Sequence, residues 1–285
     1  MALWMETAMR TLNLPSGQSI PVLGMGTWQM GENAKNRQSE INALRHGLDL
    51  GLSLIDTAEM YGEGGAEEVI AHAIAHCRAS VFLVSKVYPH NASKRGAIAA
   101  CDRSLKRLKT DYLDLYLLHW RGSIPLAETL EAFETLQQAG KIRSYGVSNF
   151  DVEDMEEASQ HKVGKTIATN QVLYNLMRRG IEWNLLPWCR QRNIPIMAYS
   201  PIEQGRLLND RTLKTIAQER GVTAAQVAIA WLLHQDNVIV IPKSSRIDHV
   251  EQNYAALDLK LSAEELATLD AAFPPPTKPV SLEML

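Results

Sequence analysis

The stretches VFLVSK, residues 81–86, and LDLYLLH, residues 113–119, contain the pattern that decides the fold. Each is a short and largely apolar run that ends on one polar side chain. Such runs alternate poorly between apolar and polar residues and are typical of parallel strands buried on both faces. Between the two runs, apolar residues recur on one helical face: Ile98, Cys101, Leu105 and Leu108. The pattern predicts a strand, a helix and a second parallel strand.

The same alternation extends in both directions along the chain. Six more short runs are predicted as strands: residues 23–27, 53–56, 142–147, 168–172, 195–199 and 238–241. Helices are indicated between them by the capping-box pairs Thr223/Gln226 and Ser262/Glu265, and by the apolar face of Leu126, Leu130 and Phe133. Eight strands separated by helices predict an α/β protein with a (β/α)8 TIM barrel. A doubly wound open sheet is the alternative, because the sequence does not show closure.

The two ends of the chain differ from this repeat. Residues 12–22 carry Pro15-Ser16-Gly17 in their middle and predict a short N-terminal β-hairpin. Residues 274–285 are predicted to be irregular. No linker interrupts the rest, and a barrel needs about 250 residues. We therefore expect residues 1–285 to form a single barrel domain.

Composition and charge exclude several classes of protein. The chain is 46% hydrophobic and 21% charged, and its net charge of −3 comes with dispersed basic residues, so neither nucleic acid nor a membrane is expected as a partner. Residues 1–12 lack the apolar stretch of a signal peptide, and no run approaches the roughly 18 apolar residues of a membrane span. The three cysteines are widely spaced, which favours reduced thiols. We expect a cytoplasmic monomer.

Neither a metal nor a Rossmann-type nucleotide site is predicted. His72 and His76 lie one helical turn apart beside Cys77, but the plain interpretation is an ordinary helix surface without a metal. Gly24 and Gly26 begin like a dinucleotide fingerprint, but the third glycine is misplaced. A nucleotide would therefore be held in another way.

Four polar side chains stand at the carboxyl ends of three successive predicted strands. Asp56 ends the second strand and Tyr61 follows it in the loop, while Lys86 ends the third and His119 the fourth. Active sites of (β/α)8 barrels are built at this rim, so these side chains should converge there. The alternatives are ordinary ones: Asp56 with Thr57 could cap the next helix, and the other residues could satisfy loop backbone.

The four residue types suit proton donation to a carbonyl oxygen. A phenol has a pKa of about 10, and the nearby ammonium of Lys86 is expected to lower the pKa of Tyr61. Asp56 can pair with Lys86, and His119 can hydrogen-bond the substrate oxygen or tune Tyr61. Reduction also needs a hydride source, which implies a nicotinamide close by.

Over almost its whole length the chain resembles the aldo-keto reductases. The resemblance rests on six motifs in order: Gly24-Met25-Gly26-Thr27-Trp28, Leu54-Ile55-Asp56-Thr57-Ala58 with Tyr61-Gly62, Ser85-Lys86-Val87, Leu117-Leu118-His119-Trp120, Gly146-Val147-Ser148-Asn149-Phe150 and Ile241-Pro242-Lys243-Ser244. It implies an NADPH-dependent reductase whose catalytic tetrad is Asp56, Tyr61, Lys86 and His119. Tyr61 would be the general acid in reduction and the general base in oxidation.

The resemblance also implies which residues bind NADPH or NADP+. Ser148, Asn149 and Gln171 would bind the nicotinamide carboxamide, and Tyr199 would stack on the ring, although Asn149 could instead cap a helix and Tyr199 could be barrel packing. The other cofactor-binding positions are Gly26, Thr27, Trp28 and Asp56, then Ser200, Pro201, Ile202 and Gln204 around the pyrophosphate, and Gln252 and Asn253 at the adenine.

The preference for NADPH over NADH rests on the segment Lys243-Ser244-Ser245-Arg246. Two cations with two hydroxyls suit a monophosphate, and the family uses this stretch for the 2′-phosphate. The alternative is a solvated helix start. His249 stands where many relatives have a further arginine, which leaves the degree of preference open.

The expected substrate is a small carbonyl compound. Trp28, Tyr88 and Trp120, with Tyr61 and His119, match positions that line the family's substrate pocket. The family uses the region after Phe273 to restrict substrates, and that region is short here, so the resemblance implies a permissive aldehyde reductase. The overall pattern is similar to bacterial methylglyoxal reductases. This implies reduction of 2-oxoaldehydes.

Two other kinds of function stay open at this point. A non-redox barrel enzyme acting on a sugar phosphate would use Lys243 and Ser244 for the substrate phosphate. A non-catalytic protein that senses NADPH would bind the cofactor without turnover.

Overall fold

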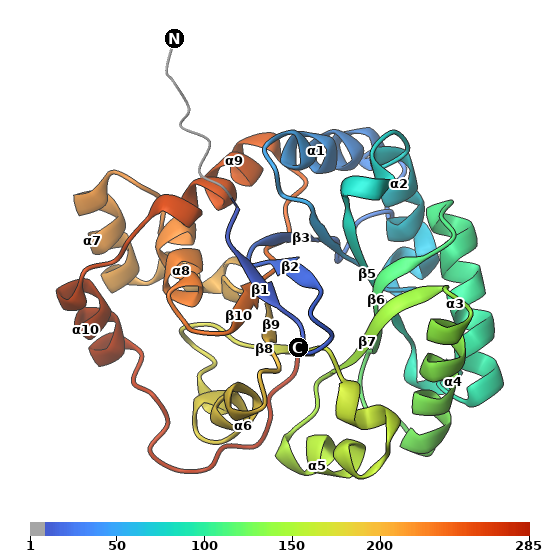
Figure 1. The fold of residues 1–285 in the computed structure, drawn as a ribbon. Coiled ribbons are helices and arrows are strands. Elements are labelled where there is room, and N and C mark those ends of the chain that lie inside the picture. Colours follow the sequence, from blue (N-terminus) through green and yellow to red (C-terminus); the bar gives the residue numbers. More distant parts are fainter. Residues whose placement is uncertain (1–8) are drawn as a thin grey trace.

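The computed structural model describes residues 9–285, and the predicted lack of a signal peptide depends in part on residues 1–8, which lie outside that range. Eight parallel strands form a ring that helices surround (Figure 1). The strands are β3 (Gly24–Gly26), β4 (Leu54–Asp56), β5 (Phe82–Val87), β6 (Leu113–Leu118), β7 (Ile142–Ser148), β8 (Asn170–Leu173), β9 (Ile196–Tyr199) and β10 (Val238–Val240).

The ring closes between its first and last strands. Neighbours along the chain pair in parallel from β3 to β10, and bridges join Leu23 to Val240 and Gly26 to Lys243. The predicted (β/α)8 barrel is confirmed, and the open-sheet alternative is wrong because these bridges join the two edges.

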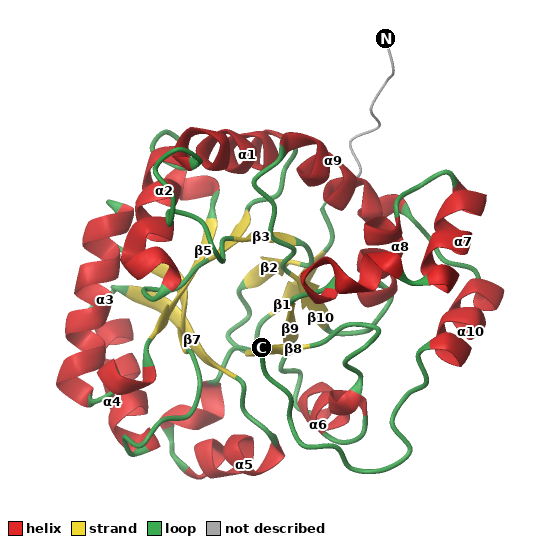
Figure 2. Ribbon diagram, turned by 180° about the vertical axis from the view of Figure 1, so that it is seen from behind, coloured by secondary structure: helices red, strands yellow, loops and turns green. Residues whose placement is uncertain are grey.

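Helices cover the outside of the barrel (Figure 2). They are α1 (Arg37–Asp49), α2 (Gly65–Ala73), α3 (Lys94–Leu108), α4 (Leu126–Gln138), α5 (Val152–Gln160), α6 (Leu185–Gln191), α7 (Arg211–Arg220), α8 (Ala224–Leu233), α9 (Ile247–Ala255) and α10 (Ala263–Ala272). Both predicted capping boxes are present, at Thr223 for α8 and at Ser262 for α10. None of the helices within residues 9–285 is long and apolar enough to cross a membrane.

Two apolar layers hold the barrel together. The larger one packs the helices onto the outer faces of the strands. The smaller one fills the barrel with residues such as Leu54, Phe82 and Leu115, and it also includes Ile20 of the hairpin. Because both strand faces are buried, the strands have no polar face, which explains their poor alternation.

The predicted hairpin is present as β1 (Thr11–Asn13) and β2 (Ser19–Pro21), which pair antiparallel. Its Ile20 belongs to the apolar cluster inside the barrel, together with the residues that begin β4 and β5. The hairpin therefore covers the amino end of the barrel and leaves the carboxyl end open. Residues 274–285 contain no helix or strand, as predicted, and both views place the C-terminus over the barrel centre (Figures 1 and 2).

Candidate active site

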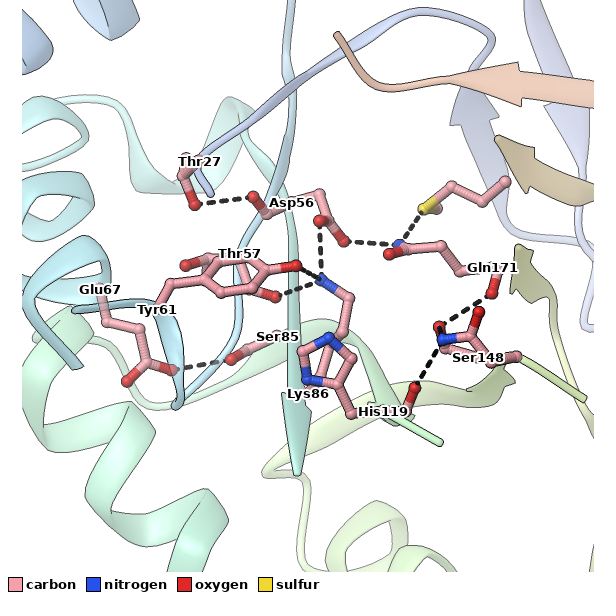
Figure 3. Close-up of polar contacts among 12 residues, drawn as sticks. Thr27, Asp56, Thr57, Tyr61, Glu67, Ser85, Lys86, His119, Ser148 and Gln171 are labelled. Atoms are coloured by element: carbon pink, nitrogen blue, oxygen red, sulfur yellow. Dashed lines mark hydrogen bonds and ion pairs between the residues drawn. The ribbon is translucent and has the colours of Figure 1, made fainter. Parts of the chain in front are cut away.

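The four predicted catalytic side chains lie together at the carboxyl ends of β4, β5 and β6 (Figure 3). The ammonium Nζ of Lys86 lies 2.7 Å from Asp56 Oδ2 and 3.3 Å from the hydroxyl of Tyr61. It also donates to the carbonyl oxygen of Thr57 at 2.7 Å. The ring of His119 stands edge-on to that of Tyr61, with centroids 5.7 Å apart. The barrel topology thus brings together residues that are up to 63 positions apart in sequence.

Asp56 holds Lys86 and does not cap a helix. Its Oδ2 accepts from Lys86, and its Oδ1 accepts from Nε2 of Gln171 at 2.7 Å. The N-caps of the next 3-10 turn and of α2 are Met60 and Gly64, and neither makes a side-chain cap. The helix-cap alternative for Asp56 is therefore wrong. Both carboxylate oxygens are satisfied inside the barrel, where an unpaired charge would be costly.

The pKa of Tyr61 moves in the direction opposite to the expectation. Burial, with the negative charge of Asp56, raises the pKa of Tyr61 well above its ordinary value. The expectation of a lowered pKa for Tyr61 is wrong, because loss of hydration around a buried phenolate is the largest effect on this group. Burial lowers the pKa of Lys86 itself, although Asp56 opposes that change. The resting site therefore holds a protonated phenol beside the ammonium that is paired with Asp56.

His119 is neutral at physiological pH. Burial and the charge of Lys86 lower the pKa of His119 to about 2. Its Nδ1 is buried and has no hydrogen-bond partner within the described residues. A buried polar nitrogen without a partner is uncommon in folded proteins.

Asn149 joins the ends of three strands. Its Nδ2 donates to the carbonyl oxygen of His119 and to the hydroxyl of Ser148, both at 3.1 Å, and its Oδ1 accepts from the hydroxyl of Tyr199 at 3.0 Å. The cap of α5 is Asp151, in a capping box with Asp154 that the sequence analysis missed. The helix-cap alternative for Asn149 is therefore wrong.

A cleft of about 800 Å³ opens above these side chains. Most of the residues predicted to bind cofactor or substrate line it: Gly26, Thr27, Trp28, Asp56, Tyr61, His119, Trp120, Ser148, Asn149, Gln171, Tyr199, Ser200, Pro201, Ile202, Gln204, Lys243, Ser244, Gln252 and Asn253. One continuous cleft thus receives residues from the ends of every barrel strand except β5, whose Lys86 lies buried beneath it.

Comparison with known proteins agrees with this geometry. The model of the Aldo/keto reductase family matches residues 22–273. The chain belongs to the aldo/keto reductase family.

Its relatives include reductases of small dicarbonyl compounds. It is 53% identical to methylglyoxal reductase YeaE of Escherichia coli, over 94% of this chain and 96% of the relative. It is 34% identical to glyoxal reductase of Bacillus subtilis, over 94% of each chain. The crystal structure of an aldo-keto reductase from Klebsiella pneumoniae in complex with NADPH is similar, with a TM-score of 0.95 and 52% identity over 98% of this chain and 100% of that one.

Besides Lys86, three predicted site residues of this aldo/keto reductase lie outside the cleft lining. Tyr88 packs edge-on against Trp120, with ring centroids 5.3 Å apart, and so supports a wall residue. The hydroxyl of Ser245 accepts a hydrogen bond from Nζ of Lys243 at 3.3 Å. Arg246 points to Asp248, with contacts of 3.0 and 2.6 Å.

Other residues line the cleft without having been predicted. They are Gln29, Met60, Gly205, Leu208, Thr223, Ala224, Ala225, Ile241, His249, Met284 and Leu285. Met60 and Gly205 stand next to the predicted residues Tyr61 and Gln204, and Ile241 begins one of the quoted motifs, so the sequence could have pointed to these three. Nothing in the local sequence points to Met284 or Leu285, because the tail reaches the cleft only through the fold.

Proposed function

We propose that this chain reduces small aldehydes and 2-oxoaldehydes such as methylglyoxal to alcohols, with NADPH as the hydride donor. The observation that carries the proposal is the buried ion pair of Lys86 with Asp56, which holds an ammonium 3.3 Å from the hydroxyl of Tyr61 at the cleft. The names of the relatives, and a similar chain crystallised with NADPH, support the substrate class and the cofactor.

The cleft has the donor set that a nicotinamide dinucleotide needs. Amide and hydroxyl groups of Ser148, Asn149 and Gln171 would hold the carboxamide, and the ring of Tyr199 would stack on the nicotinamide. Left-handed backbone at Ser200, Gln204 and Gly205 shapes the loop that would wrap the pyrophosphate. Lys243 and Ser244 would bind the 2′-phosphate. When bound, NADPH supplies a hydride to the carbonyl carbon.

The chain's own residues move and hold the proton. Tyr61, whose pKa is raised, is protonated and can donate to the carbonyl oxygen as negative charge develops there. The ammonium of Lys86 stabilises the phenolate that this step leaves, and Asp56 keeps the ammonium in position. Neutral His119 offers a ring nitrogen to hydrogen-bond and orient the carbonyl oxygen.

The remaining wall of the cleft favours a small neutral substrate. Trp28, Met60, Trp120, Met284 and Leu285 give it an apolar and aromatic surface. Among the described residues that line the cleft, the basic ones other than His119 are Lys243 and His249, from the segment after β10 and from α9. A substrate that carries its own carboxylate or phosphate would find no cation on the aromatic wall.

Carbonyl-dependent oxidation of NADPH tests the proposal. The purified chain is assayed with methylglyoxal and a panel of neutral and anionic aldehydes, with NADH in parallel. We expect turnover with methylglyoxal, faster with NADPH than with NADH. Binding of NADPH without turnover of any carbonyl would indicate a sensing protein instead. Lack of NADPH binding would favour the sugar-phosphate enzyme.

A further inference from the structure

The C-terminal tail, residues 274–285, is held over the carboxyl end of the barrel by few polar contacts. Among residues 9–285, two hydrogen bonds hold it: Arg178 Nη1 donates to Glu283 Oε1 at 2.5 Å, and the amide of Leu285 donates to the hydroxyl of Tyr199 at 3.4 Å. A cavity of about 110 Å³ lies beneath the tail, lined by Leu282 and Glu283 among others. Leu282 also packs against the main apolar cluster, so among residues 9–285 Arg178 supplies the one side-chain ion pair of an otherwise largely apolar attachment.

The guanidinium of Arg178 also contacts the loop of residues 200–205. This loop lines the part of the cleft that we assign to the cofactor, and we call it the cofactor loop. The Nε and Nη2 atoms of Arg178 donate to Oε1 of Glu203 at 3.0 and 2.9 Å. Glu203 is fully buried, and its other carboxylate oxygen accepts from Asn175 at 2.8 Å. Its neighbours Ile202 and Gln204 line the cleft. One guanidinium therefore contacts both the cofactor loop and the tail.

We propose that Arg178 is a positioning residue that couples the tail to the cofactor loop, so that cofactor binding and docking of the tail strengthen each other. The inference rests on the proposed use of NADPH. A half-exposed ion pair usually stabilises little, because two flexible side chains must be ordered to form it. Here Glu203 already orders Arg178, so docking Glu283 requires the ordering of one side chain.

The direction of the coupling follows from where the contacts lie. A cofactor that contacts residues 200–205 fixes the segment that carries Glu203, and Glu203 in turn fixes the guanidinium. The tail then brings Met284 and Leu285 to the cleft. By thermodynamic linkage, a tail that docks better on the loaded protein must raise cofactor affinity by the same factor. From the usual strength of such pairs we expect a factor of roughly two to five.

Glu283 offers a clean perturbation because it does not line the cofactor cleft. We expect E283Q to weaken NADPH binding roughly two- to fivefold by calorimetry, and to raise KM for methylglyoxal with little change in kcat. A purely through-space effect has the opposite sign, since removal of a negative charge favours an anionic cofactor. The matched control is E68Q on α2, which removes the exposed ion-pair partner of Arg37 on α1; the side chains of Glu68 and Glu283 are 50% and 39% exposed.

A double-mutant cycle with Arg178→Met identifies the route. If Arg178 carries the coupling, E283Q has no further effect on the NADPH Kd once Arg178 is replaced. We expect R178M to fold, because buried Glu203 keeps Arg206 and Asn175 as partners. Thermal unfolding of the variant checks this. If it does not fold, Arg178→Lys replaces it, because a single ammonium cannot reproduce the forked contacts to two carboxylates.

The outcomes separate this inference from the proposed function. Failure of the wild-type chain to bind NADPH refutes the proposed function, and the coupling with it. Normal NADPH binding together with an unchanged or tightened Kd in E283Q refutes the coupling alone. A weakened Kd that persists equally in the Arg178 background also refutes it. Weakening that disappears in that background, with E68Q like the wild type, supports it.

Discussion

Replacement of Asp56 by Asn should destabilise the barrel and make its stability depend on pH. The substitution keeps the shape of the side chain but removes its charge. It leaves the ammonium of Lys86, which is fully buried, with the hydroxyl of Tyr61 and the carbonyl oxygen of Thr57 as partners. Gln171 can keep a hydrogen bond with the new amide after reorientation.

The magnitude follows from the burial of the pair. Removal of one partner from a buried ion pair usually costs about 3–5 kcal/mol, because the other charge is left without compensation. Asn retains an oxygen that can accept from Lys86, which places the expected loss of unfolding free energy at about 3 kcal/mol near pH 7.

The pH dependence has a definite sign. Burial already lowers the pKa of Lys86, and Asp56 opposes that lowering, so its removal lets the pKa fall further. The unfolded chain, in which a lysine has a pKa of about 10.4, then binds more protons than the folded one. The unfolding free energy of D56N should therefore rise with pH between the folded and unfolded pKa values, more steeply than that of the wild type.

Urea unfolding followed by tryptophan fluorescence, at several values from about pH 6 to about pH 9, measures both effects. The matched control is Asp102→Asn, which breaks the exposed pair with Lys141 and should cost at most about 1 kcal/mol. A D56N loss no larger than that of the control, or a stability that falls as the pH rises, would refute the reasoning.

Three further predictions concern the cofactor site, a helix cap and the proton donor. Lys243→Met should weaken NADPH binding roughly tenfold or more, because a charge-assisted contact with the 2′-phosphate is lost, and should leave NADH binding nearly unaffected. Equal losses of affinity for the two cofactors in calorimetric titrations would contradict the assignment of Lys243 to the 2′-phosphate. Ser262→Ala should lower the unfolding free energy by about 1 kcal/mol through loss of the α10 capping box, while Ser262→Asp should retain it, as urea titration would show. The kcat/KM for reduction should stay level from about pH 6 to about pH 9. His119, with its pKa lowered to about 2, stays neutral in that range, and Tyr61, with its raised pKa, stays protonated. A titration step in kcat/KM inside that range would count against this description of the site.

The positions of the four side chains proposed as catalytic were predictable because the ends of neighbouring barrel strands lie side by side. A short apolar run that ends on a polar residue locates the carboxyl end of a strand, and the ends of adjacent strands meet. Lys86 and His119 could therefore be placed beside Asp56 from sequence alone, and their contacts with it or with Tyr61 in the structure agree.

What escaped prediction depends on burial and on distant contacts. The direction of the Tyr61 pKa is set by loss of hydration, which no local motif records. Arg246, predicted to bind the 2′-phosphate, pairs with Asp248 and is not among the residues that line the cleft. Arg178 meets Glu283 across 105 positions, and the tail carries no periodic pattern that would place it.

The central claim is that Tyr61 donates the proton in an NADPH-dependent reduction, and Tyr61→Phe tests it most directly. The change removes one hydroxyl and keeps the ring that packs beside His119. The purified variant is titrated with NADPH by calorimetry and then assayed for turnover of methylglyoxal. We predict an NADPH Kd within about twofold of the wild type and a kcat lower by at least about a hundredfold. Turnover close to that of the wild type would contradict the claim.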